Sequence, residues 1–202
     1  MAQDDNSPGA TEQESETLSP VKRALGEIRL LRTELEECRR SQSQPVAIVG
    51  LAVRLPGGVI TPELFWDALA EGKDLIASIP PERWEAQEYW SPEGDQPGTL
   101  YDNHGGFLSD VDAFDADFFG INAREATSMD PQQRILLELT WEALERAAID
   151  PRSLLNTQTG IFLGISNSDY GRMLIEEPCR VDGYTGVGAA ASIAAGRLAY
   201  FL

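Results

Sequence analysis

The chain has 202 residues, of which 42% are hydrophobic and 24% charged, a composition typical of a globular protein. Its net charge of −17 argues against a nucleic-acid partner, because a phosphate backbone requires a surface rich in lysine and arginine. Cys38 and Cys179 have no second cysteine or histidine at ligand spacing, so we expect no metal site, no disulfide framework and a reducing, cytoplasmic location. The sequence has neither an export signal nor an apolar run that spans a bilayer, so we expect no membrane partner.

The N-terminal part of the sequence predicts a tail and then a helix. Residues 1–19 are acidic and poor in apolar side chains, and we expect them to be disordered. Residues 20–40 predict a helix with one apolar seam at the alternating spacing of three and four that is typical of a coiled coil, formed by Val21, Ala24, Ile28, Leu31, Leu35 and Cys38. So short a helix is marginal alone, so we interpret it as a dimerising or docking helix whose partner is a second copy. An amphipathic helix lying on its own domain is the alternative, and residues 41–44 read as a linker.

After the linker the chain predicts alternating strands and helices. Residues 46–49 form a β-branched apolar run typical of a buried strand, and residues 159–165 predict a second one. Thr61 followed by Pro62 predicts the start of a helix. After this helix, residues 73–122 predict irregular loops packed around many aromatic side chains.

A second helix is predicted to begin at Asp130, whose carboxylate can accept the free amide of Gln133, with Pro131 in the first turn. Apolar residues cover nearly its whole circumference up to Ala148, so we expect a central, buried helix. A last helix is predicted over residues 192–202. The predicted elements follow the order strand, long loop region, helix, strand and helix. This order is typical of an α/β layer with parallel strands.

No pattern in the sequence names a reaction by itself. The paired glycines lack the spacing of nucleotide-binding loops, so turn and close-packing roles are favoured. His104 is the one histidine of the chain and has no nucleophile beside it, so a surface role is favoured over a catalytic one. The acidic run over residues 110–117 lacks the central glycine and closing glutamate of a calcium loop.

Four segments carry a family pattern: PVAIVGLAVRLPGG at 45–58, GGFLSDVDAFDADFFGINAREATSMDPQQRILLELTWEALERAAID at 105–150, TGIFLGIS at 159–166 and DGYTGVGAAASIAAGRLAYFL at 182–202. In their order and spacing they resemble the ketosynthase domain of modular polyketide synthases, a β-ketoacyl synthase of the thiolase-like superfamily. The MDPQQR core at residues 129–134 is highly specific to that family.

The resemblance implies a truncated ketosynthase: residues 45–202 would form the N-terminal half of a thiolase-like α/β fold. The parent would be an acyltransferase that performs decarboxylative Claisen condensation in polyketide or fatty acid biosynthesis. Its cysteine nucleophile sits at a helix N-terminus, where the helix dipole lowers the thiol pKa, and two histidines assist it. These three residues are expected beyond Leu202, so we assign no catalytic residue and expect the chain as given to be inactive.

For the site, the resemblance suggests Gln132 and Gln133, because the start of this helix lines the acyl pocket in related condensing enzymes. Completion of the helix cap is the equally supported role of Gln133. The preceding loop residues Asn122, Arg124 and Glu125 are assigned structural roles.

The resemblance also implies partners. No cofactor would bind directly; the phosphopantetheine of an acyl carrier protein would carry the substrate. The N-terminal helix would dimerise the subunit and receive an upstream synthase subunit. The alternatives are a docking fragment that pairs with synthase subunits without catalysis, or a regulatory or structural fragment.

Overall fold

The computed structural model describes residues 20–92 and 96–202 and divides the chain into two units, with the boundary between Ala47 and Ile48. In the first unit the predicted helix is present as α1 (Pro20–Gln42), which extends two residues into the predicted linker. It buries no side chain, so every apolar residue of the predicted seam is exposed. The tail predicted for residues 1–19 lies outside the described residues.

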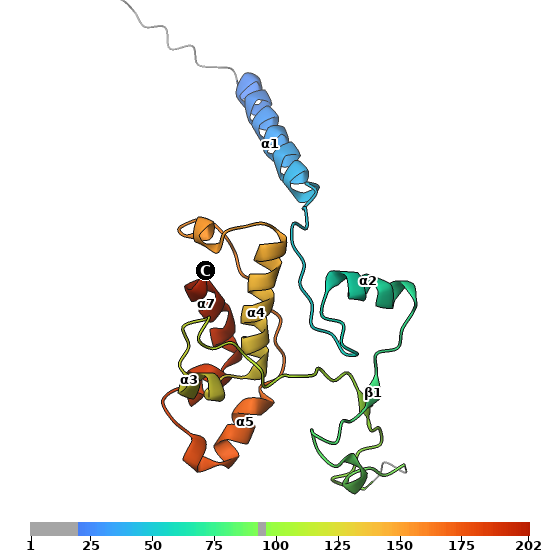
Figure 1. The fold of residues 1–202 in the computed structure, drawn as a ribbon. Helices are drawn as coiled ribbons and strands as arrows, with labels where there is room; N and C mark the ends of the chain where they lie inside the picture. The colour runs from blue at the N-terminus through green and yellow to red at the C-terminus, as the bar shows by residue number, and fades with distance from the viewer. Residues whose placement is uncertain (1–19, 93–95) are drawn as a thin grey trace, which may run out of the picture. The chain divides into compact units, whose positions relative to one another are not determined.

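The second unit, residues 48–202, consists mainly of helices joined by irregular segments (Figure 1). The elements of this unit are, in order, α2 (Pro62–Ala70), β1 (Ala77–Ser78), η1 (Ala86–Glu88), β2 (His104–Gly105), α3 (Ala123–Ser128), α4 (Pro131–Arg146), η2 (Pro151–Leu154), α5 (Asp169–Glu176), η3 (Pro178–Arg180), α6 (Thr185–Ala189) and α7 (Ala191–Phe201). Thr61 caps α2 as predicted and accepts a hydrogen bond from the amide of Leu64 at 3.2 Å, with Pro62 at the first helical position. No helix among residues 20–92 and 96–202 is long and apolar enough to cross a membrane.

The core of this unit lies where α4 packs beside α7 (Figure 1). Its buried centre is apolar and is made by Ile121, Met129, Leu137 and Leu198. Aromatic rings extend it, and their centroids lie 4.8 to 6.0 Å apart in stacked, tilted and edge-on pairs that involve Phe114, Phe118, Phe119, Trp141 and Phe201. Such offset and edge-on geometries are favourable for aromatic rings.

The two predicted parallel strands are absent from the described structure. Residues 46–49 and 159–165 belong to no helix or strand, and the strands that do form, β1 and β2, are a two-residue antiparallel pair. Val46 is 91% exposed and Phe162 is 94% exposed. On the other face, Ile161 and Leu163 pack against the core. The strand prediction was wrong here because a strand requires a hydrogen-bonded neighbour, and no described segment lies in that place.

Two further expectations were wrong in part. The aromatic residues of segment 73–122 are only partly packed: Tyr101 is 81% exposed, and Trp84 has an edge-on contact with Phe107 at 6.5 Å. In α4, Leu137 is buried, but most other apolar positions are half-buried. Both differences have the same cause, because these surfaces face no second layer among the described residues.

The segment that begins the second unit is held against α4 by a close backbone contact and by an ion pair. Gly50 has no room for a side chain, because an added Cβ would overlap the carbonyl oxygen of Ala143. Arg54 forms a two-armed ion pair with Glu142. Burial raises the pKa of the neighbouring Glu138 carboxyl, while the Arg54 charge opposes that shift. The ion pair and the glycine thus fix where the chain crosses α4.

Candidate functional site

The start of α4, which contains the family-specific MDPQQR core, is capped by Asp130. Its carboxylate accepts the amide of Gln132 at 2.9 Å, not that of Gln133 as predicted. Pro131 lowers the number of free amides in the first turn, and the amide of Gln133 is bonded instead to the Asp130 carbonyl. The prediction of an Asp130 cap was therefore correct in its residue and wrong in its partner.

Gln133, one of the two predicted pocket residues, joins three helices. Its side chain is buried and donates to the carbonyl oxygens of Gly188 at 2.8 Å and Ala190 at 3.1 Å. Its own oxygen accepts from Nε of Arg197 at 3.1 Å. Since the buried side-chain amide of Gln133 would be unpaired without these bonds, they fix α4 against α6 and α7.

The same guanidinium continues this network to α3. Arg197 donates through Nη1 to Glu125 at 2.6 Å, and both side chains are mostly buried. Asn122 caps α3 by accepting the amide of Glu125 at 2.9 Å. Asn122 and Glu125 thus have structural roles, as predicted. Asn122 caps α3, and Glu125 connects α3 to α7 and, through Arg197, to α4. We call Gln133, Arg197 and Glu125 the clamp.

Asp182 organises the turn that leads into α6. Its carboxylate accepts the amide of Tyr184 at 2.8 Å and Nε of Arg124 at 2.6 Å. Its backbone amide in turn donates to Oγ1 of Thr185 at 2.9 Å. Removal from water raises the pKa of the Asp182 carboxyl, but the bonds from Tyr184 and Arg124 outweigh it and the net pKa is lowered.

This lowered pKa predicts an acid-sensitive contribution to stability. A carboxyl whose folded pKa lies below its unfolded value stabilises the protein above the unfolded pKa, and the contribution is lost as pH falls through the folded pKa. We therefore expect the difference in free energy of unfolding between the wild type and Asp182→Asn to shrink as pH falls from 7 to below 3.8. Urea unfolding at stepped pH measures it.

The control for this prediction is Asp67→Asn on the exposed face of α2. The pH dependence of this variant's difference from the wild type should be smaller than that of Asp182→Asn, because the Asp67 carboxylate accepts no hydrogen bond in the part of the chain that the structure describes. A difference for Asp182→Asn that does not change with pH would contradict the proposed role of Asp182.

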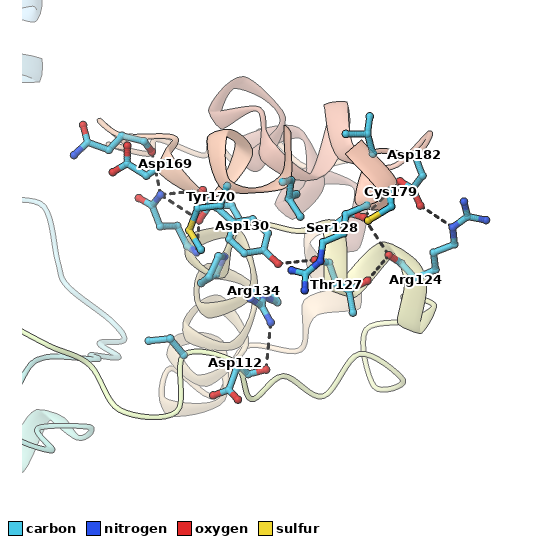
Figure 2. Close-up of a pocket in the computed structure, with 18 of the residues that line it drawn as sticks. Asp112, Arg124, Thr127, Ser128, Asp130, Arg134, Asp169, Tyr170, Cys179 and Asp182 are labelled. Atoms are coloured by element: carbon cyan, nitrogen blue, oxygen red, sulfur yellow. Dashed lines mark hydrogen bonds and ion pairs between the residues drawn. The ribbon is translucent and has the colours of Figure 1, made fainter. Parts of the chain in front are cut away.

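A cavity of about 990 Å³ opens beside the start of α4, and Figure 2 shows the side chains around it. Gln132 lines it, and the amide of this side chain donates to the carbonyl of Asn167 at 3.0 Å. Tyr170 on α5 lines it too and donates its hydroxyl to the carbonyl of Thr127 at 2.6 Å. Of the two predicted pocket residues, the structure thus places Gln132 at this large cavity, whereas the polar atoms of Gln133 are directed to the helices.

Arg134 is the buried cation of the cavity wall. It is 8% exposed, donates through Nη1 to the carbonyl of Asp112 at 3.2 Å, and lies 6.0 Å from the ring centroid of Tyr170. Its Nε is buried without a hydrogen-bond partner among the described residues. The guanidinium is stabilised by the aromatic face and one carbonyl in place of a carboxylate.

The described residues hold no pair of nucleophile and base. Cys38 lies exposed on α1 and Cys179 exposed on η3 at the cavity rim. His104 lies in β2, half-exposed, with Nδ1 3.0 Å from a carboxylate oxygen of Asp102. No group of three or more metal-ligating side chains occurs in the part of the chain that the structure describes. Cys179 therefore lines the cavity with no histidine beside it among the described residues.

Sequence reasoning missed Arg197, Asp182, Arg134 and Tyr170. Asp182 had a local signal, since an aspartate two residues before a bonded amide forms an Asx turn. Arg134 belongs to the MDPQQR core. Arg197 had no local signal, because its partners are 64 and 72 residues away in the chain.

Comparison with known proteins gives consistent matches. Residues 43–202 match the family model "Beta-ketoacyl synthase, N-terminal domain". The chain is 46% identical over 190 residues to polyketide synthase GfsB of Streptomyces halstedii, covering 94% of this chain. It is 51% identical over 159 residues to a phenolphthiocerol/phthiocerol polyketide synthase of Mycobacterium bovis, covering 79% of this chain. The chain spans 3% and 9% of the lengths of these relatives.

Solved structures agree with this assignment. The ketosynthase domain OzmH KS7 of oxazolomycin biosynthesis from Streptomyces albus JA3453 matches with a TM-score of 0.69 and 36% identity, over 76% of this chain and 27% of that one. The ketosynthase from module 6 of the bacillaene synthase of Bacillus subtilis 168 matches with a TM-score of 0.63 and 35% identity, over 77% of this chain and 24% of that one. The predicted fold class is confirmed, although the described residues form no parallel sheet.

Proposed function

Because the chain belongs to the β-ketoacyl synthase family, as a ketosynthase N-terminal segment of the polyketide synthase type, we propose that residues 48–202 serve decarboxylative Claisen condensation in polyketide biosynthesis. The observation that carries this proposal is the family match over residues 43–202, which contains the whole clamp. In such a condensation a thiolate accepts an acyl group from a thioester, and decarboxylation of a malonyl-type extender then supplies the carbanion that attacks it.

The contribution of this unit is scaffold and binding surface. The first step requires a thiol that is deprotonated by a helix dipole or a neighbouring base. Cys179 lies on a three-residue 3-10 helix and is exposed, and His104 is held by Asp102. Neither supplies that environment. We therefore expect the 202 residues by themselves to be inactive in acyl transfer.

The substrate carrier and the partners follow from the family. The acyl group arrives on the phosphopantetheine arm of an acyl carrier protein, and no cofactor binds this chain directly. The exposed seam of α1 supports a homodimer and contact with an upstream synthase subunit. The place of action is the cytoplasm.

A docking fragment without catalysis is the second candidate function. It is favoured by α1, whose apolar seam has no partner among the described residues. In this case the chain pairs with synthase subunits through α1, and residues 48–202 stabilise that pairing without reacting.

Acyl transfer tests the scaffold role. The full chain is mixed with an acyl carrier protein that bears a thioester, and intact mass is measured. We expect no acyl adduct above the level of the Cys38→Ser/Cys179→Ser variant. An adduct on Cys38 or Cys179 that forms with saturable kinetics would contradict inactivity and establish a nucleophile in this chain.

A further inference from the structure

Arg134 of α4 is a buried cation whose charge is not paired with a carboxylate among the described residues. It is 8% exposed, and its Nη1 donates to the carbonyl oxygen of Asp112 at 3.2 Å. Within residues 20–92 and 96–202, neither its buried Nε nor its second terminal nitrogen, Nη2, has a hydrogen-bond partner. Removing a guanidinium from water is costly unless its N–H groups are bonded and its charge is paired. The edge formed by Nε and Nη2 is therefore free to bind an oxyanion.

The other arginines of the cavity wall are already used or lie in water (Figure 2). Arg124 forms an ion pair with Asp182, and Arg180 forms one with Glu177, each with 2.6 Å between nitrogen and oxygen. Arg83 is exposed and donates to a backbone carbonyl at 2.7 Å. A ligand gains most from a new ion pair with the buried guanidinium, because charges interact more strongly where water is excluded.

The aspartates of the wall limit the charge of such a ligand. The buried Asp130 is satisfied by the backbone and side-chain amides of Gln132, at 2.9 to 3.3 Å, while Asp112 and Asp169 are exposed. Four arginines and four aspartates line the cavity, so its formal charge is zero. A ligand with one negative charge is paired by Arg134 alone. A dianion such as phosphate brings a second negative charge close to carboxylates, which is unfavourable.

The cavity wall also has an aliphatic part. Val111, Met173, Leu174 and Val181 line it, and Met173 is 63% exposed and Val181 49% exposed. A ligand that covers these side chains removes apolar surface from water. The volume of about 990 Å³ accommodates an aliphatic chain together with a polar end. One cation beside an aliphatic surface fits a ligand with one anionic end and an apolar body.

We propose that this cavity binds a monocarboxylic acid with an aliphatic chain. The carboxylate accepts hydrogen bonds from Nε and Nη2 of Arg134, and the chain lies against Met173 and Val181. Two parallel N–H···O bonds to one carboxylate are the geometry in which a guanidinium binds it most strongly. The site goes beyond the proposed function, in which the transferred acyl group is a thioester without a free carboxylate.

Ligand-observed NMR titration of the full chain tests the class of ligand, with hexanoate and its neutral counterpart hexanamide as probes. We expect hexanoate to bind saturably with a dissociation constant on the order of 1 mM. Hexanamide should bind about tenfold more weakly or less, because it brings no charge to the guanidinium. Equal binding of the two probes, or no saturation by hexanoate, overturns the proposal. Inorganic phosphate that binds more tightly than hexanoate and displaces it overturns the monocarboxylate class.

Arg134→Met tests the residue, because it removes the guanidinium and keeps an unbranched side chain. It should weaken hexanoate binding about tenfold or more. Far-UV circular dichroism should show an unchanged helix content, because no carboxylate loses its partner. The matched control is Arg146→Met in the last turn of the same helix, outside the cavity wall, which should keep the affinity for hexanoate within about twofold of the wild type. Equal affinities of the two variants overturn the role of Arg134, and the comparison of hexanoate with hexanamide tests the proposal on the wild type even where a variant does not fold.

The two cysteines test the location. Cys179 lines the cavity and is exposed, whereas Cys38 is exposed on α1. Saturating hexanoate should slow the alkylation of Cys179 by iodoacetamide several-fold and leave the rate at Cys38 unchanged, as followed by peptide mass spectrometry. Hexanamide at the same concentration should protect Cys179 less. An unchanged rate at Cys179, or equal slowing at both thiols, overturns the placement of the ligand in this cavity.

Discussion

Leu137→Ala is expected to lower the free energy of unfolding by about 2–5 kcal/mol, the range for removing a large aliphatic side chain from a packed core. Leu137 is 1% exposed and lies in the core cluster with Met129 and Leu198. Its removal leaves a cavity between α4 and α7 that neighbouring helices fill only partly. Urea unfolding followed by tryptophan fluorescence measures the loss, and Trp141 on α4 reports on the same region.

Leu69→Ala on α2 is the control for this substitution. Leu69 also lies inside a helix but is 60% exposed, so its truncation to alanine removes little buried apolar area. We expect a change below about 1 kcal/mol. Losses of equal size at the two positions would contradict a core centred on Leu137.

Four helices, α1, α2, α4 and α7, were predictable from the sequence because their signals are local, whereas α3, α5 and α6 were not predicted. Thr61 and Asp130 each place an oxygen within three residues of a free amide, and a proline follows both. The seam of α1 repeats within its own 23 residues. Each of these features depends on contacts inside one element, so the sequence alone specifies them.

Strands and the clamp were not predictable in the same way. Apolar, β-branched segments such as residues 46–49 have the composition of a buried strand, but pairing depends on a neighbour that the segment itself does not encode. Likewise, Gln133 was identified as a site residue, but its partners Gly188 and Arg197 lie more than 50 positions away. Only the folded chain shows that the amide of Gln133 is used to join helices.

The family resemblance supplied what local patterns could not. Residues 129–134 identified the family, and the match over residues 43–202 confirmed it. The resemblance did not determine what Gln132 and Gln133 do in this chain. The structure assigns them different environments, with Gln132 at the cavity and Gln133 in the buried network, because successive helical residues point about 100° apart.

Gly188→Ala is expected to lower the free energy of unfolding by about 3 kcal/mol or more, at the upper end of the range for overpacking. An added Cβ would overlap the carbonyl oxygen of Ser128 and lie 3.1 Å from the amide nitrogen of Met129. Both are backbone atoms at the end of α3, just before α4, so no side chain can move aside to relieve the overlap. The carbonyl of Gly188 also accepts the amide of Asp130 at 2.9 Å and the side chain of Gln133 at 2.8 Å. Moving α6 outward would therefore weaken both bonds and the cap region together.

Gly186→Ala, two residues earlier in the same short helix, is the matched control. No atom lies within 4 Å of a Cβ added at Gly186, so this substitution meets no obstacle. Replacing a helical glycine by alanine removes conformational freedom from the unfolded chain, and we expect a gain of up to about 1 kcal/mol. Opposite signs at two glycines of one helix would locate the cost at the contact between α6 and Ser128, because intrinsic helix propensity favours alanine at both. A loss at Gly186 as large as at Gly188 would instead mean that α6 tolerates no side chain anywhere, and the contact with Ser128 would no longer explain the effect.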